Sequence, residues 1–202
     1  LNPNLITTIY NGIDINSFKH NYKKYKSPTI CCISRLTKQK RVNNLILAIK
    51  ILREKIKNVK CIIIGDGPEF NNLKKLIEEN NLQNNVELKG YTSKKELKEI
   101  LARSNIFCLP SILEGFGIVL LESLASKTPY ICSDIQVFKE ITEDFKGGLS
   151  FKKKDHNDLS NKIYNLISNK KLYNKKLIER SKLVKKYDWK VISKQYENVI
   201  SN

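Results

Sequence analysis

The 202-residue chain is 41% hydrophobic and 28% charged, a balance typical of a globular protein with a substantial core. Lys and Arg outnumber Asp and Glu by 37 to 20, so the formal net charge is +17 and the pI is about 9.6. No apolar run approaches the roughly 20 residues that span a bilayer, which argues against a transmembrane helix.

Six short apolar segments have the length and composition of buried strands. They lie at 29–34, 60–64, 86–89, 106–109, 130–132 and 148–151. Between them, apolar residues recur at helical spacing and predict helices at 41–54, 69–80, 93–103 and 117–126. The third of these helices opens on Ser93 and Glu96, which have the spacing of a capping box.

Strands that alternate with helices need crossover connections, and such connections build a parallel sheet covered on both faces. We therefore predict an α/β fold: a Rossmann-like, doubly wound parallel sheet of about six strands, with a helical and Lys-rich C-terminal tail. Residues 1–27, with a strand-like stretch at 5–10, are interpreted as an interdomain connection. Residues 28–154 would form the Rossmann-like domain, and 155–202 would add two or three helices to it.

The positive charge leaves three interpretations open: nucleic-acid binding, attraction to an anionic membrane surface, or a lysine-rich surface that is merely solvated. The lysines are spread along the whole chain and lack the interleaved aromatics of a base-stacking surface. We therefore expect no nucleic-acid partner. An anionic membrane surface remains a candidate partner.

Five cysteines lie within the predicted apolar strands: Cys31, Cys32, Cys61, Cys108 and Cys132. No C-x-x-C pair occurs among them. This pattern predicts reduced thiols that pack as small hydrophobic side chains, with no zinc site. It also favours a cytoplasmic location. The positive net charge leaves open a peripheral position at the inner membrane face.

The loops after the strands are the places to look for a site, because ligands of open parallel sheets bind at the carboxyl ends of the strands. The first loop, 34–41, brings Arg35 and Lys40 to the start of a helix, where free amides and the helix dipole already favour anions. A bound phosphate would explain why two cationic side chains stand at the positive end of a helix. A cluster of solvated lysines also fits. The turn at 65–68 is a weaker indication of the same kind.

The loop at 110–117 has the most specific pattern. Two glycines flank Phe116 where a helix should begin, and Glu114 and Glu122 stand eight positions apart, so both can face one crevice. Glu122 interrupts an apolar helix and is costly there unless it is paired or binds something. A pairing with a lysine, or a cap on a neighbouring turn, is the alternative. Paired carboxylates also serve glycoside hydrolysis.

The stretch EGFGIVLLE, preceded by LPS, resembles the signature of family-4 retaining glycosyltransferases of the GT-B fold. Five further segments are similar to other blocks of that family and follow in the same order: NGID, SRLTKQKRVNNLILA, IIIGDGP, VELKGY and SDIQVFKEI. The resemblance covers nearly the whole chain. It implies the C-terminal, donor-binding domain of such an enzyme, with an N-terminal acceptor domain preceding Leu1.

The resemblance also implies roles for single residues. Arg35 and Lys40 would bind the donor diphosphate and Glu114 the transferred sugar, and these three form the predicted catalytic set. The donor would also be contacted by Ser34, Gly65, Gly90, Tyr91, Gly115, Phe116, Gly117, Ile118, Val119 and Glu122. Within that set, Glu122 would bind the ribose, which places it too far from the sugar for hydrolysis. Ser34 and Arg41 stand where the family has glycine.

The sequence thus predicts the donor half of an enzyme that moves a sugar from a nucleotide-diphosphate sugar to a glycan, lipid-linked or other hydroxyl acceptor. We expect no cofactor and no metal, and weak donor binding with little turnover by the chain alone. The alternatives are a basic Rossmann-like nucleotide- or anion-binding module, or another GT-B enzyme such as a glycogen or sucrose synthase relative or a sugar-nucleotide epimerase.

Overall fold

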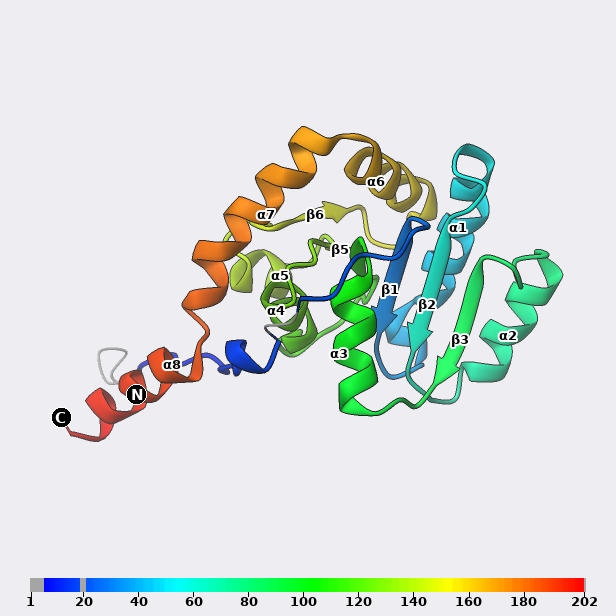
Figure 1. Cartoon of the computed structure of the whole chain (residues 1–202). Helices are drawn as coiled ribbons and strands as arrows, with labels where there is room; N and C mark the ends of the chain where they lie inside the picture. The colour runs from blue at the N-terminus through cyan, green and yellow to red at the C-terminus, as the bar shows by residue number, and fades with distance from the viewer. Residues whose placement is uncertain (1–5, 19–20, 202) are drawn as a thin grey trace.

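The computed structural model describes residues 6–18 and 21–201, and its centre is one sheet of parallel strands (Figure 1). The strands are β1 (Thr29–Ile33), β2 (Lys60–Ile64), β3 (Val86–Gly90), β4 (Ile106–Leu109), β5 (Tyr130–Ser133) and β6 (Gly148–Phe151). Their order in the sheet is β3-β2-β1-β4-β5-β6. This is the doubly wound order, so the predicted fold class is confirmed.

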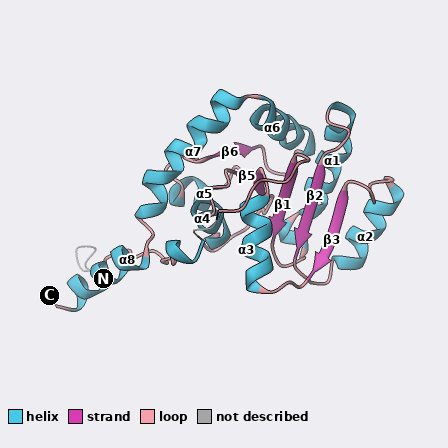
Figure 2. Cartoon of the chain, viewed as in Figure 1, coloured by secondary structure: helices cyan, strands magenta, loops and turns pink. Residues whose placement is uncertain are grey.

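Helices cover both faces of the sheet (Figure 2). They are α1 (Val42–Lys55), α2 (Phe70–Glu79), α3 (Lys94–Arg103), α4 (Ile118–Ala125), α5 (Gln136–Ile141), α6 (His156–Ser168), α7 (Lys170–Lys185) and α8 (Trp189–Ile200), with the 3-10 turns η2 (Ile15–Phe18) and η3 (Lys38–Lys40). The core of one face contains residues of α1, α2 and α6, and the core of the other contains residues of α3, α4 and α5.

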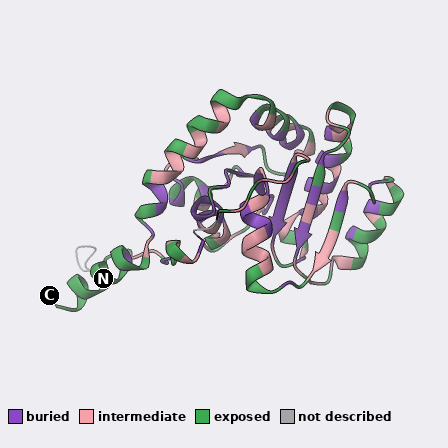
Figure 3. Ribbon diagram, in the orientation of Figure 1, coloured by how far each residue is buried: buried purple, intermediate pink, exposed green. Residues whose placement is uncertain are grey.

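The central strands β1, β4 and β5 consist mainly of apolar residues because they are buried on both faces, as Figure 3 shows for β1. Along β1, Ile30 and Cys32 pack on the α1 side, whereas Cys31 and Ile33 pack on the α4 side. All five cysteines are free and buried, as the sequence predicted. Burial raises the pKa of both Cys31 and Cys32 to about 12, which keeps these thiols protonated.

The predicted strands and helices agree with the observed ones to within one or two residues, but two features differ. Helix α5 was not predicted, because its six residues are too few to show a helical period. The strand expected at 5–10 is wrong over residues 6–10, which form no strand; Leu5 lies outside the described residues. The capping box is half confirmed, since Ser93 Oγ accepts from the Glu96 N–H at 3.2 Å.

The segment that contains the 3-10 turn η2 is tied to the C-terminal helices. Ile13 N–H donates to the Tyr187 carbonyl at 2.7 Å, and Trp189 N–H donates to the Ile13 carbonyl at 3.1 Å. Residues 11–18 therefore pack where α7 passes into α8. The division of the chain after residue 27 stays a prediction.

The order of the strands reverses between β1 and β4. At such a switch point the neighbouring loops diverge to opposite faces and leave a crevice at the carboxyl ends of the strands. The loops after β1 and β4, which carry the predicted catalytic residues, lie on the two sides of this switch point. Within the described ranges, no helix combines the length and apolar character of a membrane span.

Candidate functional site

The loops after β1 and β4 are joined by an ion pair at the switch point. Lys40 Nζ donates to Glu114 Oε1 at 2.6 Å, and Ser111 Oγ donates to the same oxygen at 2.8 Å. The backbone reinforces this junction, since Ile112 N–H donates to the Gln39 carbonyl at 2.9 Å. Two residues of the predicted catalytic set, 74 positions apart, are thereby brought into contact.

Both side chains of the ion pair have hydrogen-bonding groups that no described residue uses. The side chains of Lys40 and Glu114 are only 17% and 11% exposed. One of three ammonium N–H groups of Lys40 is engaged, and Glu114 Oε2 has no partner among the described residues. The pair thus presents cationic donors and a carboxylate acceptor side by side, which suits a phosphate next to a sugar hydroxyl.

The start of α4 is shaped by Gly117. This residue caps the helix with a φ of 81°, and a Cβ there would lie 2.7 Å from Cε1 of Phe138. In the described part of the chain, none of the backbone N–H groups from Gly115 to Val119 has an acceptor. These free amides lie at the positive end of the helix dipole and form a cradle for an anion.

The ring of Phe116 faces an aromatic cluster rather than the loop. Its centroid lies 6.0 Å from that of Tyr10 and 6.2 Å from that of Tyr187. Both tyrosines are fixed, because Tyr10 Oη donates to Glu140 at 2.7 Å and Tyr187 Oη donates to the Ile141 carbonyl at 2.8 Å. Phe116 therefore anchors the loop through its side chain and leaves its backbone to a ligand.

The predicted residues of the first three loops also converge at the carboxyl edge. A Cβ on Gly65 would lie 1.9 Å from the Ser34 carbonyl oxygen, so only glycine fits. Gly65 N–H donates to the Gly90 carbonyl at 2.9 Å, and Leu36 N–H donates to the Asp66 carbonyl at 2.8 Å. The loops after β1, β2 and β3 are thus stacked against one another.

Three other residues near this junction are Arg35, Tyr91 and Arg41. Arg35 is exposed and forms no ion pair in the described ranges. Tyr91 is 90% exposed. Arg41 has a φ of 50°, a left-handed conformation that costs a non-glycine residue about 1–2 kcal/mol. This conformation gives a physical reason for glycine in the family pattern, and here an arginine adopts it.

Glu122 is a half-buried carboxylate in the second turn of α4. Burial raises its pKa, and the charge of Lys98 on α3 only partly offsets this effect. Glu122 forms no ion pair or hydrogen bond through its side chain to any described residue, so the alternative of a lysine pair is not what the structure shows. A desolvated carboxylate without a partner is costly, which favours a role toward a ligand.

The sequence reasoning missed two contributors to the site. Ser111, three residues before Glu114, donates a hydrogen bond to it. Lys98 is the cation whose charge lowers the pKa of Glu122. Ser111 carried a usable signal, because a hydroxyl three positions before a carboxylate in a tight loop can reach it. Lys98 carried none, since its position relative to α4 depends on how α3 crosses the sheet.

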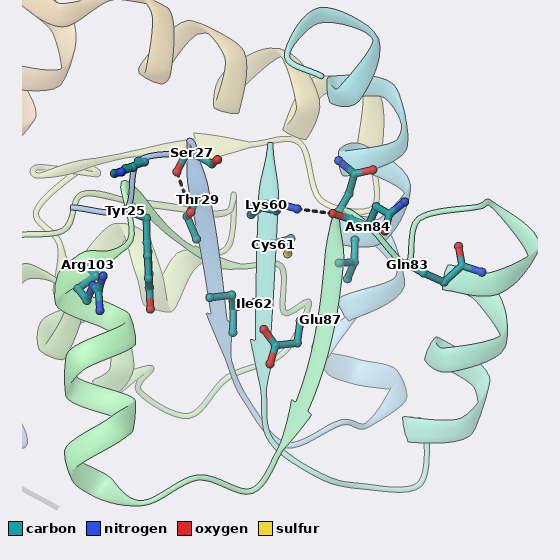
Figure 4. A pocket seen from close by; sticks show the side chains of 13 residues that line it. Tyr25, Ser27, Thr29, Lys60, Cys61, Ile62, Gln83, Asn84, Glu87 and Arg103 are labelled. Atoms are coloured by element: carbon teal, nitrogen blue, oxygen red, sulfur yellow. Dashed lines mark hydrogen bonds between the residues drawn. The ribbon is translucent and has the colours of Figure 1, made fainter. Parts of the chain in front are cut away.

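A hollow of about 680 Å³ lies at the other end of the strands (Figure 4). None of the predicted site residues lines it, and two of its cations, Lys60 and Arg103, already have partners. Lys60 Nζ donates to the Asn84 carbonyl at 2.6 Å, and the Arg103 guanidinium lies 4.4 Å from the ring centre of Tyr25. The predicted site residues therefore lie at the carboxyl edge and not at this hollow.

Among the described residues, no three His, Cys, Asp or Glu side chains gather as a metal site would require. Metal independence nevertheless stays a prediction, because it concerns the reaction and not only the residues of this chain.

Residues 14–184, which include both loops of the junction, match the family model described as glycosyl transferases group 1. The chain belongs to this family. This group 1 glycosyltransferase chain is 29% identical over 201 residues to the poly(ribitol-phosphate) alpha-N-acetylglucosaminyltransferase of Staphylococcus aureus, a match that covers 98% of the chain and 40% of that relative. It is 33% identical over 187 residues to an uncharacterized glycosyltransferase of Methanocaldococcus jannaschii, covering 92% of the chain and 50% of the relative.

Solved structures agree with this membership. A variant of S. aureus TarM, in complex with fondaparinux, alpha-GlcNAc-glycerol and UDP, superposes with a TM-score of 0.81 at 30% identity, covering 97% of this group 1 chain and 39% of TarM. Anabaena HepE in complex with UDP-glucose shares the fold, with a TM-score of 0.83 at 21% identity and coverage of 96% and 56%. The chain thus spans about half or less of the two curated relatives named above.

Proposed function

We propose that this chain is the donor-binding unit of a retaining, family-4 glycosyltransferase, which moves a sugar from a nucleoside-diphosphate sugar to a hydroxyl acceptor. The observation that carries the proposal is the Lys40–Glu114 pair, which joins two loops at the switch point and keeps donor and acceptor atoms available. The complex of TarM with UDP supports the same class of ligand, because TarM is 30% identical to this chain.

The proposed chemistry places positive groups where charge develops. When the bond between the anomeric carbon and the diphosphate oxygen breaks, negative charge grows on the leaving diphosphate. Lys40 meets it with its two remaining N–H groups, and Arg35, which is free to reorient, adds a planar bidentate fork. The amides from Gly115 to Val119 complete the cradle.

The two carboxylates divide the donor between them in this proposal. Glu114 is fixed through Oε1 by Lys40 and Ser111, so Oε2 accepts a hydrogen bond from the transferred sugar. Glu122 accepts from the ribose hydroxyls, which compensates a carboxylate that has no other partner among the described residues.

We infer further that the acceptor and any catalytic base belong to a second domain. This chain by itself would then bind the donor weakly and turn over little. The acceptor class and a cytoplasmic site of action belong to the same proposal.

Calorimetry with a panel of UDP, GDP and ADP sugars tests the donor site directly. At least one donor class should bind, and at a hundred times its Kd it should stabilise the fold by about 2.7 kcal/mol. In the enzyme joined to its acceptor domain, Arg35→Ala or Lys40→Ala should slow transfer by about two to three orders of magnitude.

Lys38 offers a matched control for Lys40. It lies in the same 3-10 turn, is exposed, and lines a separate hollow with Arg41, so Lys38→Ala should leave transfer nearly unchanged. Failure of every nucleotide sugar to bind, or wild-type turnover for Lys40→Ala, would contradict the proposal.

A further inference from the structure

One side of α7 carries a stripe of lysines. Seven of its sixteen residues are Lys or Arg, and only Glu179 is acidic. Four of the lysines recur at helical spacing on the side exposed to solvent: Lys171, Lys175, Lys182 and Lys185. Ile178 lies in the middle of this stripe and is 69% exposed. We call these five residues the α7 stripe.

The opposite side of α7 holds the helix on the domain. Leu183 and Val184 are buried there, and Arg180 donates to the Leu124 carbonyl at the end of α4 at 2.7 Å. Figure 1 shows α7 along the outer edge of the molecule, and Figure 3 shows exposed residues along its length. Because the inward residues fix the helix, the fold does not require the α7 stripe.

The charge of the stripe is not neutralised by neighbouring acids. Glu179 is shared by Lys175 and Lys176, at 3.9 Å and 2.9 Å. Lys171, Lys182 and Lys185 have no acidic partner among the described residues. Like charges three or four positions apart destabilise a helix, so the stripe opposes helix formation unless an anionic partner covers it.

Glu143, which lines one hollow with Lys182, already has partners as well. It forms ion pairs with Lys146 and Lys186, so it leaves no free carboxylate for the stripe. Glu143 therefore does not neutralise the lysines of the stripe.

The exposed side chain of Ile178 indicates which kind of anionic partner the lysines would bind. With the stems of Lys171 and Lys175 it lines an open hollow of about 700 Å³. The stripe offers no aromatic ring on which the bases of a single-stranded nucleic acid could stack. At a bilayer surface the isoleucine enters the apolar layer while the lysine stems extend their charges to the headgroups.

We propose that the α7 stripe docks this domain on an anionic phospholipid surface. The lysines contact the headgroups, and Ile178 inserts between them. No residue of the stripe belongs to the loops after β1 and β4, so the proposed docking surface and the proposed donor site are made of different residues. The inference goes beyond sugar transfer and stands on different residues.

Flotation of the full chain with vesicles tests the docking surface. We expect binding to vesicles in which phosphatidylglycerol replaces about a third of the phosphatidylcholine, and little binding to phosphatidylcholine alone. Changing Lys171, Lys175, Lys182 and Lys185 together to Gln should weaken binding by about two to three orders of magnitude, because each lysine near such a surface contributes roughly fivefold.

A second quadruple variant removes the same charge elsewhere. Lys57, Lys74, Lys94 and Lys95 are all exposed and lie outside α7, so their change to Gln should weaken binding by no more than about threefold. Ile178→Ser should weaken binding by about fivefold to tenfold at low and high salt alike, since salt does not screen an apolar contact.

Thermal unfolding of each variant checks that the fold is intact. Equal losses in the two quadruple variants would overturn the proposal, because the charge alone would then explain the binding. Tighter binding of single-stranded RNA than of the anionic vesicles, with no effect of Ile178→Ser, would overturn it in favour of a nucleic acid.

Discussion

Two basic regions of this molecule use lysine in opposite ways. At the carboxyl edge, Lys40 is sheltered, paired with Glu114 and held in loops that also contain left-handed residues. On α7, the lysines are exposed, mostly unpaired and carried by a regular helix. The net charge of +17 does not separate the two regions; burial and pairing do. Sheltered charge suits one small ligand in a fixed pose, whereas exposed charge suits an extended anionic surface.

The loop after β4 differs from the regular helix α7 in having a constrained backbone, and a change at Gly117 tests this constraint with the largest expected effect. Gly117→Ala should destabilise the fold by about 2–4 kcal/mol, because the left-handed φ is strained and the new Cβ overlaps Phe138. Gly115 is the matched control, since a Cβ there meets no atom within 4 Å. Urea unfolding of both variants provides the measurement.

Calorimetry separates the two glycines further. Gly115→Ala should keep nearly wild-type stability and yet weaken donor binding by about tenfold, because its Cβ would occupy the space that the donor needs. Equal destabilisation by the two variants would mean that the loop is not shaped as described. Unchanged donor binding by Gly115→Ala would remove Gly115 from the site.

Glu122 makes the stability of the fold depend on pH. Burial raises its pKa above the ordinary value of 4.5, so the folded chain holds a proton that the unfolded chain has released in the window just above pH 4.5. Stability therefore falls as pH rises through that window, and Glu122 is unfavourable to the fold at neutral pH.

Glu122→Gln should consequently stabilise the fold at pH 7 by about 1 kcal/mol and weaken donor binding. The gain in stability should disappear as the pH falls well below 4.5. Glu122 is then uncharged in both the folded and the unfolded chain, as Gln is at every pH. Urea unfolding at several pH values checks this. A gain that is the same at every pH would show that desolvation of the carboxylate is not its cause.

The smallest effect is expected on α7, where the cost of the lysines can be measured. Lys171→Glu places an acid at the start of the helix and four positions before Lys175, so it should stabilise the fold by about 0.5 kcal/mol. Lys171→Gln, which only removes the charge, should stabilise it by less. A loss of stability with Lys171→Glu would mean that the stripe carries no such cost.

Much of this architecture was predictable because it depends on local pattern. Continuous apolar runs fixed the strands, and the loops after them followed from the alternation with helices. Helix α5 is too short to show a helical period, and residues 6–10 form no strand although their composition suggests one. For the site, the sequence pointed to Lys40, Glu114 and Gly117, while the supporting role of Ser111 depended on the path of one loop.

By itself, the sequence determined the α/β alternation, the positions of the glycines that allow tight turns, and the spacing that puts the α7 lysines on one side of a helix. Only the tertiary structure decided that Lys40 meets Glu114, that the Phe116 ring packs against Tyr10 and Tyr187, and that the lysine side of α7 faces outward. The reason is physical. Periodicity and backbone preference act between near neighbours, whereas pairing and burial depend on which distant segments the sheet brings together.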